Sequence, residues 1–402
     1  MLRHSFVIRH LSFVITFTSV IEIPAPSFDL AMSLDSGQVF HWQKTGKGFA
    51  GTIGDFAVYI EQNGNVLKVR DGGAPARSPR RPLPEIVARY FALDHPLAEI
   101  CASFPGDAVM NTSRKFCRGL RIIRQPKWEC LATFICSSMK QVAHIRQISL
   151  ALRRRFGDQR RVGDQVVYTF PRAQRIARAS EDDLRKCALG YRARNLLMTA
   201  RLVSSGKANL EAWSALPDAD LREKLCALPG VGAKIANCVM LFAYERLRAF
   251  PIDVWIERTL KQQYFPRKKK VTTLQLREFS ETYFGEHGGY AQQCLFHHAR
   301  TALRKSAAAR DSSPAHRSAR NDKGRDTRVA SRKSRNSKRF LDSESACSPG
   351  HCGPFEVRGP RNEKRRDARM ASWSQEQPET LEPKGFRVRN DNGRPWLRGS
   401  GN

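Results

Sequence analysis

The chain has 402 residues and a formal net charge of +31, with 69 Lys and Arg against 38 Asp and Glu. This length allows two ordinary domains plus tails. The excess of basic over acidic residues argues for nucleic acid as the partner and against an anionic membrane. Residues 306–402 hold 22 Lys and Arg against 12 Asp and Glu, so +21 of the charge remains on the first 305 residues. A basic tail therefore explains only part of the excess.

Neither end of the chain has the sequence pattern of a folded domain. Residues 3–15 form an imperfect tandem repeat, RHSFVIRHLSFVI, and apolar residues continue to Ile23. Basic residues before an apolar run imitate a signal peptide, but no small-residue cleavage site stands out and the run is too short to span a membrane convincingly. We interpret residues 1–26 as a disordered or artefactual extension, with a signal peptide as the alternative. Residues 306–402 lack periodicity and are predicted to be a disordered basic tail.

The first folded region alternates apolar and polar residues over positions 28–69. Turn residues at Gly46–Gly48, Gly54–Asp55 and Asn63-Gly64 divide it into segments of strand length. Alternation between such turns predicts short antiparallel strands.

From Pro84 onward the apolar residues recur with helical spacing. The segment WECLATFICSS, for example, is apolar nearly all round and is predicted to be a buried helix. The fold class is therefore α+β. We predict a small N-terminal antiparallel domain over residues 27–112, followed by an all-helical domain over residues 113–305.

The most informative stretch is LPGVGAK at residues 228–234. Pro and Gly predict a tight hairpin between two helices, and the backbone N–H groups of Gly230, Val231 and Gly232 would suit a phosphate oxygen. Lys234 lies in the first turn of the second helix, and Cys238 lies one turn further on the same face. In such a hairpin a Lys often contacts only phosphate, and this alternative stays open for Lys234.

A carboxylate follows the second helix of the hairpin. Phe250-Pro251-Ile252-Asp253 places Asp253 at the start of the next predicted helix. LPGVGAK followed by PID, with GYRAR upstream, resembles the helix-hairpin-helix DNA glycosylases with a Gly-Pro-Asp-type loop (HhH-GPD), and among them the 8-oxoguanine DNA glycosylases. The resemblance extends over residues 27–305 and implies a TBP-like sheet in the N-terminal domain.

The resemblance implies a bifunctional reaction. Lys234 would attack the sugar C1′, displace the base and form a Schiff base, while Asp253 would stabilise the developing positive charge. The Schiff base then permits β-elimination and strand cleavage. Two alternatives remain: a monofunctional glycosylase for alkylated or deaminated bases, which would not need Lys234, and a DNA-binding module without enzymatic activity.

The resemblance also implies a pocket for the damaged base. Gly37 opens the segment GQVFHW, which matches the family's Gly-Gln-x-Phe-x-Trp, and its carbonyl would accept the N7–H that distinguishes 8-oxoguanine from guanine. Gln292 would bind the Watson–Crick edge, Phe296 would stack on one face of the base, and Cys238 would cover the other. Taken alone, Gly37 also fits an ordinary turn, and Gln292 and Phe296 each fit a packed core.

A third group of residues concerns the base opposite the lesion. The family places asparagines after Ser-Ser, whereas this chain has Met139-Lys140-Gln141. Met139 could wedge into the base stack but cannot make amide hydrogen bonds, and Lys140 could contact a phosphate. By resemblance Tyr191 is a wedge and Arg192 donates to the opposite base. The alternative for this pair is a helix start with Tyr191 packed and Arg192 solvated.

Cysteine usage bears on cofactors and on location. Most of the ten cysteines lie in apolar helical patterns, which predicts reduced thiols and a protein that is not secreted. After Asp253 only Cys294, Cys347 and Cys352 remain, too few for the four-cysteine iron–sulfur loop that many relatives carry. We expect no metal and no cofactor, although a monovalent cation could bridge hairpin carbonyls and phosphate. The expected partner is double-stranded DNA containing oxidised guanine, bound by a monomer in a bacterial nucleoid or a eukaryotic nucleus.

Overall fold

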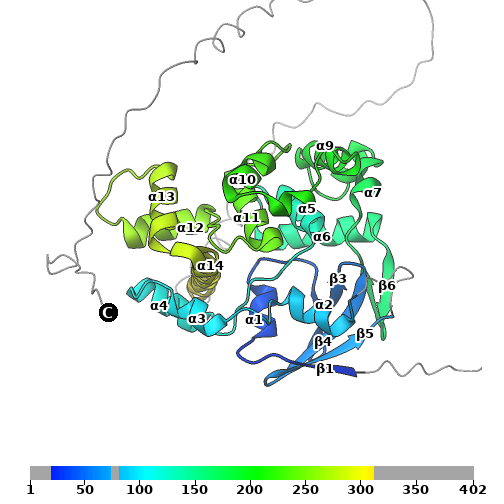
Figure 1. Cartoon of the computed structure of the whole chain (residues 1–402), viewed down its shortest axis with the longest axis horizontal. Coiled ribbons are helices and arrows are strands. Elements are labelled where there is room, and N and C mark those ends of the chain that lie inside the picture. The colour runs from blue at the N-terminus through cyan, green and yellow to red at the C-terminus, as the bar shows by residue number, and fades with distance from the viewer. Residues whose placement is uncertain (1–19, 74–80, 312–402) are drawn as a thin grey trace, which may run out of the picture. The chain divides into compact units, whose positions relative to one another are not determined.

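The N-terminal domain is built on a five-stranded antiparallel sheet with strand order β1-β5-β4-β3-β2 (Figure 1). The computed structural model describes residues 20–73 and 81–311. The strands are β1 (Val20–Pro24), β2 (Gln43–Thr45), β3 (Gly48–Ile53), β4 (Phe56–Asn63) and β5 (Val66–Asp71). Each predicted turn joins two neighbouring strands in this sheet, so the predicted short antiparallel strands are confirmed. Alternate residues of β4 and β5 point into the core, including the fully buried Val58, Ile60, Leu67 and Val69.

The domain begins earlier than the sequence indicated. β1 pairs with β5 from Val20↔Arg70 to Pro24↔Val66 and forms an edge of the sheet. The predicted extension over residues 1–26 is therefore wrong for residues 20–26, because VIEIP looks like the end of the preceding apolar run until its partner strand is known. Residues 1–19 and the tail beyond residue 311 lie outside the described residues, so neither prediction is tested there.

Helices make up most of the rest. Beside the sheet are α1 (Leu30–Asp35) and α2 (Leu83–Tyr90). The helical domain contains α3 (Leu97–Ala102), α4 (Ala108–Phe116), α5 (Lys127–Ser137), α6 (Val142–Phe156), α7 (Ala173–Ala177), α8 (Glu181–Arg185), α9 (Arg192–Ser204), η1 (Ala212–Ala215), α10 (Asp218–Cys226), α11 (Ala233–Tyr244), α12 (Val254–Thr259), η2 (Leu260–Tyr264), α13 (Thr273–Tyr283), η3 (Gly285–His287) and α14 (Gly288–Asp311). None of the described helices is long and apolar enough to cross a membrane.

The boundary between the two cores does not fall at residue 112. That position lies inside α4, which packs against α14. Leu97, Ile100 and Met110 belong to the hydrophobic core of the helical domain, whereas Phe91 still belongs to the core beneath the sheet. Residues before position 112 therefore already belong to the core of the helical domain.

The helical domain is confirmed, but it is not helical throughout. β6 (Gln159–Val162) and β7 (Gln165–Tyr168) form an antiparallel hairpin within it. Val162 and Val167 pack against Ala50 and Ala57 of the N-terminal sheet. The hairpin thus connects the two domains, a role that depends on a distant surface and is not visible in the local pattern.

Candidate active site

The predicted hairpin lies between α10 and α11. Gly230 has φ +79, and a Cβ there would come within 2.8 Å of the Asn195 side chain, so this turn needs glycine. The N–H of Val231 already donates to the Leu228 carbonyl at 3.1 Å, although we expected it to face a phosphate. Gly232 is the exposed N-cap of α11, where the first N–H groups of a helix have no partner within the helix. The N–H groups of the hairpin that stay available are therefore those at the end that starts at Gly232, and their contact with a phosphate stays a prediction.

Lys234 and Cys238 lie one turn apart on α11, as predicted. Lys234 is half-buried, with its Nζ 5.3 Å from the centroid of the Phe134 ring. Cys238 is buried, and burial raises the pKa of its thiol to about 11 despite the nearby Lys234 ammonium, which lowers it. The thiol is therefore a neutral, weakly polar surface beside the amine.

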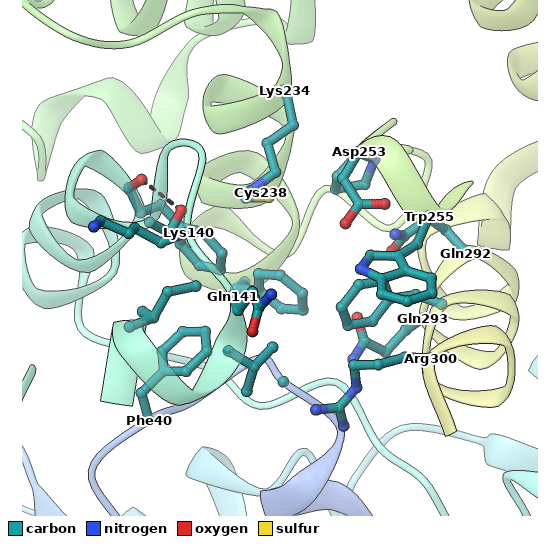
Figure 2. Close-up of a pocket in the computed structure, with 18 residues that line it drawn as sticks. Phe40, Lys140, Gln141, Lys234, Cys238, Asp253, Trp255, Gln292, Gln293 and Arg300 are labelled. Atoms are coloured by element: carbon teal, nitrogen blue, oxygen red, sulfur yellow. Dashed lines mark hydrogen bonds between the residues drawn. The ribbon is translucent and has the colours of Figure 1, made fainter. Parts of the chain in front are cut away.

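Asp253 is the N-cap of α12. Its Oδ1 accepts a hydrogen bond from the Ile256 N–H at 2.9 Å, which fixes the carboxylate at the start of the helix. Burial raises the pKa of Asp253, while the helix N–H groups and Lys234 act in the opposite direction. Figure 2 shows Lys234 and Asp253 at the same end of one cavity, on different elements.

This cavity has a volume of about 360 Å³. It holds Lys234 and Asp253 together with all four residues predicted to bind the base, namely Gly37, Cys238, Gln292 and Phe296. Its walls come from the loop after α1, from α5 and α6, and from α11, α12 and α14. A space of this size, mostly apolar with a few polar groups, is typical of a small-molecule or base-binding site.

Gln292 is the polar group that most clearly indicates a ligand. Its side chain is buried, and its Oε1 has no hydrogen-bond partner. A buried amide oxygen without a partner is costly, and such groups are rare unless a ligand or water completes them. Gln292 is buried as a core residue would be, but its unpaired Oε1 favours the predicted role in binding a ligand, which stays a prediction.

Gly37 and Phe296 are in contact across the two domains. Gly37 has φ +88, and a Cβ at this position would lie 3.0 Å from Phe296 Cε1. Its loop is held on both sides: Gln38 Nε2 donates to the Arg121 carbonyl at 2.8 Å, and Gln293 Nε2 donates to the Ser36 carbonyl at 2.9 Å. The loop is thus a wall of the cavity that is hydrogen-bonded on both sides, rather than an ordinary surface turn.

The predicted wedge residues form a separate exposed group. Met139 is 89% exposed with φ +53, and Tyr191 is 58% exposed. The Tyr191 hydroxyl donates to Met139 Sδ at 3.7 Å, so the two tips are neighbours. An exposed pair of this kind fits insertion into DNA, and the alternative of a packed Tyr191 is wrong.

Arg192 is buried, contrary to the alternative that expected it in solvent. Its Nε donates to the Ser138 carbonyl at 2.7 Å and its Nη1 to the Leu189 carbonyl at 3.2 Å. The guanidinium also lies 4.3 Å from the centroid of the Tyr191 ring. Arg192 therefore supports the turn that presents Met139, and its predicted contact with the opposite base stays a prediction.

Further residues without a predicted role in the pocket line the cavity, among them Lys140, Gln141, Trp255 and Arg300. Lys140 was expected at a phosphate. Nothing in the local pattern distinguishes the other three, because their orientation depends on how α6, α12 and α14 meet.

Within residues 20–73 and 81–302 no three His, Cys, Asp or Glu side chains lie close enough together to hold a metal ion. Cys347 and Cys352 lie outside the described residues. The absence of a cofactor and of an iron–sulfur cluster stays a prediction.

Family models match most of the described chain. Residues 20–131 match the model of the 8-oxoguanine DNA glycosylase N-terminal domain, and residues 132–282 match that of the HhH-GPD superfamily base excision DNA repair proteins. An N-glycosylase/DNA lyase of Arabidopsis thaliana is 30% identical over 283 residues, covering 66% of this chain and 76% of the plant protein.

Two similar solved structures are complexes with DNA. The Clostridium acetobutylicum 8-oxoguanine glycosylase/lyase, bound to double-stranded DNA with cytosine opposite 8-oxoguanine, has a TM-score of 0.64 and 26% identity, and the match covers 71% of this chain and 98% of that chain. MBOgg1 in complex with a low-affinity DNA ligand has a TM-score of 0.66 and 28% identity, with the same coverage of both chains.

A hairpin between two helices, a Lys at the start of the second and an Asp before the next helix define a helix-hairpin-helix DNA glycosylase. The two family models and the plant relative then make the assignment specific. The chain belongs to the 8-oxoguanine DNA glycosylases of the HhH-GPD superfamily. The family predicted from the motifs is confirmed, while the roles of single site residues stay predictions.

Proposed function

We propose that this chain acts in base-excision repair, removes 8-oxoguanine from double-stranded DNA and then cuts the strand at the abasic site. It is a bifunctional DNA glycosylase and lyase. The observation that carries the proposal is the shared cavity, in which Lys234 and Asp253 stand beside the unpaired amide oxygen of Gln292. A nucleophile, a carboxylate and a base-reading group in one space are what this reaction requires.

The damaged base must leave the DNA stack before it can enter the cavity. Flipping a base costs a few kcal/mol, which contacts outside the pocket must offset. The exposed N–H groups at Gly232 would bind the backbone phosphate, and Met139 and Tyr191 would fill the gap in the stack. Phe296 and Cys238 would then enclose the base while Gly37 and Gln292 read its edges.

The chemistry follows from the two catalytic side chains. The free amine of Lys234 attacks C1′ as the C1′–N9 bond breaks, and the base leaves with the electron pair and takes up a proton. Asp253 stabilises the positive charge that develops on the sugar and assists proton transfer. Loss of the ring oxygen from C1′ gives an imine between Lys234 and the sugar. Removal of a C2′ proton then expels the 3′-phosphate and cuts the strand.

Two alternatives fit the site less well. A monofunctional glycosylase would keep Asp253 but would not need an amine in the cavity, yet Lys234 lines it. A DNA-binding module without enzymatic activity would have no reason to keep the buried Gln292 oxygen without a partner.

We further infer that the reaction needs no metal or cofactor, since side chains supply the nucleophile and the proton transfers. A monovalent cation could bridge hairpin carbonyls and a DNA phosphate. A monomer suffices, because one chain supplies every group the mechanism uses. The place of action would be the bacterial nucleoid or the eukaryotic nucleus.

Borohydride trapping tests the proposal. The enzyme is incubated with a duplex that carries 8-oxoguanine opposite each of the four bases, and borohydride reduces any imine to a stable protein–DNA adduct. Wild type should form the adduct and Lys234→Gln should not. Lys140→Gln, which changes an exposed lysine at the same cavity, is the matched control and should still be trapped.

The other outcomes are equally informative. Excision without trapping would mean that the enzyme is monofunctional and that Lys234 contacts phosphate. Loss of the adduct in Lys140→Gln alone would assign the nucleophile to Lys140. If wild type neither excises nor is trapped, 8-oxoguanine is not the substrate and alkylated bases become the next candidates.

A further inference from the structure

Gln141 is a polar residue of the cavity that the mechanism above does not use. It is the N-cap of α6, yet its side chain makes no capping hydrogen bond and no other hydrogen bond to the described protein. It lines the same cavity as Lys234, and Figure 2 shows its amide turned into that space. Gln is not among the residue types that usually cap a helix, and Gln141 is exposed, so its amide is available to a ligand that enters the cavity.

The start of α6 borders the end of the cavity formed by Gly37. A Cβ placed on Gly37 would lie 3.7 Å from Val142 Cγ2 and 3.0 Å from Phe296 Cε1. Gln141 directly precedes Val142, whereas Gln292 comes from α14 on another wall. The two amides therefore approach a bound base from different elements, with Gln141 on the side of the Gly37 loop.

Other polar side chains nearby are already engaged or point elsewhere. Gln293 Nε2 donates to the Ser36 carbonyl, and Arg300 donates to the Asp35 carbonyl. Lys140 is exposed, and its side chain extends away from the cavity in Figure 2. Among these residues the Gln141 amide is the hydrogen-bond donor that is not bonded to the protein on the side of the Gly37 loop.

The chemistry of the base indicates what this donor would bind. In 8-oxoguanine the N7–H donor lies next to the O8 acceptor on the same edge. The Gly37 carbonyl can accept from N7–H, but a carbonyl cannot donate to O8, whereas the NH₂ group of an amide can. We propose that Gln141 determines specificity for the damaged base by donating a hydrogen bond to O8. This inference rests on the proposed function and adds a residue that reads the oxidised edge.

The test separates base removal from strand cutting. Gln141→Leu removes the donor while it keeps the approximate size, and Gln141→Glu replaces the donor with an acceptor that repels O8. Gln147→Leu, at an exposed position of α6 away from the cavity, is the matched control. Single-turnover excision is measured on 8-oxoguanine opposite cytosine, and cleavage is measured on an abasic site opposite cytosine.

Loss of one neutral hydrogen bond, which the bound base would bury, should slow excision about 10- to 100-fold in Gln141→Leu, and Gln141→Glu should be slower still. Cleavage of the abasic site should stay at the wild-type rate in both, because that substrate has no damaged base. Gln147→Leu should match wild type on both substrates.

Two results would overturn the inference and leave the proposed function intact. The first is unchanged excision in both Gln141 variants. The second is an equal loss on both substrates, because the abasic duplex keeps the opposite cytosine and a residue that reads that cytosine or supports the fold would affect both reactions. If the wild-type enzyme acts on neither substrate, the proposed function fails, and the inference fails with it.

Discussion

Arg153 on α6 and Glu129 on α5 form a buried ion pair where the helical domain meets the N-terminal sheet. Arg153 Nη1 also donates to Thr52 Oγ1 in β3 at 2.9 Å and to the Tyr168 carbonyl in β7 at 3.0 Å. His41 lies beside the pair, and burial together with the Arg153 charge lowers its pKa well below the usual value. One guanidinium therefore joins two helices, the sheet and the hairpin that connects the domains.

Glu129→Gln should destabilise the enzyme strongly. It leaves the Arg153 charge buried without its carboxylate, which typically costs about 3 to 5 kcal/mol of the free energy of unfolding. Urea unfolding measures this loss. Asp183→Asn, which breaks the exposed Arg155–Asp183 pair, is the control and should leave stability nearly unchanged. Equal stability of the two variants would mean that the buried pair does not hold the domains together.

Asp253→Asn should separate catalysis from folding. Asn caps a helix about as well as Asp, so the hydrogen bond from the Ile256 N–H and the melting temperature should be kept. The missing negative charge should slow single-turnover excision about 10²- to 10⁴-fold. Asp253→Ala serves as the comparison, because it should lose about 1 kcal/mol of helix capping as well. A fully active Asp253→Asn enzyme would limit Asp253 to a structural role.

Gly37→Ala should impair base removal through Phe296. The new Cβ would stand 3.0 Å from Phe296 Cε1, so the ring must move from the face where the base is expected to stack. Gly54→Ala is the control, because Gly54 also has positive φ, at +59, but a Cβ there meets nothing within 4 Å. Both variants should lose about 1 to 3 kcal/mol of stability from backbone strain. Only Gly37→Ala should lose excision activity. Equal excision activity of the two variants would argue against a binding site for the damaged base at Gly37.

The parts of the site that could be predicted from the sequence are local ones. The hairpin at Gly230 and Gly232, and the one-turn spacing of Lys234 and Cys238, depend on neighbouring residues and survive in the structure. The same holds for the turns between β2 and β5, because each one is a Gly or Asn signal between alternating segments. Where neighbouring residues alone determine a feature, a pattern of a few residues is sufficient to predict it.

The features that the sequence did not show depend on distant partners. Arg192 turns inward because the Ser138 carbonyl, far away in the chain, is available to it. β1 becomes a strand because β5 offers an edge, and the orientation of Gln141 depends on where α6 meets the Gly37 loop. A pattern read along one segment contains none of these partners, so it cannot distinguish a solvated side chain from a buried one.

His297 should make stability depend on pH in mildly acidic solution. It is buried next to Phe296, and burial together with the Arg300 charge lowers its pKa to about 4. The unfolded chain binds the proton near the ordinary value of 6.5, so protonation favours unfolding. The contribution of the neutral ring is therefore fully present above pH 6.5 and is lost as the pH falls from 6.5 to about 4.

Urea unfolding of wild type and His297→Gln across this range measures the effect. The free energy of unfolding of wild type should fall more steeply than that of the variant, by up to about 1.4 kcal/mol per pH unit. Gln147→Leu, which changes an exposed position of α6 and no titratable group, is a control that should keep the wild-type slope. If His297→Gln and wild type lose stability in parallel between pH 6.5 and 4, His297 is not held neutral by the fold, and other groups cause the acid sensitivity.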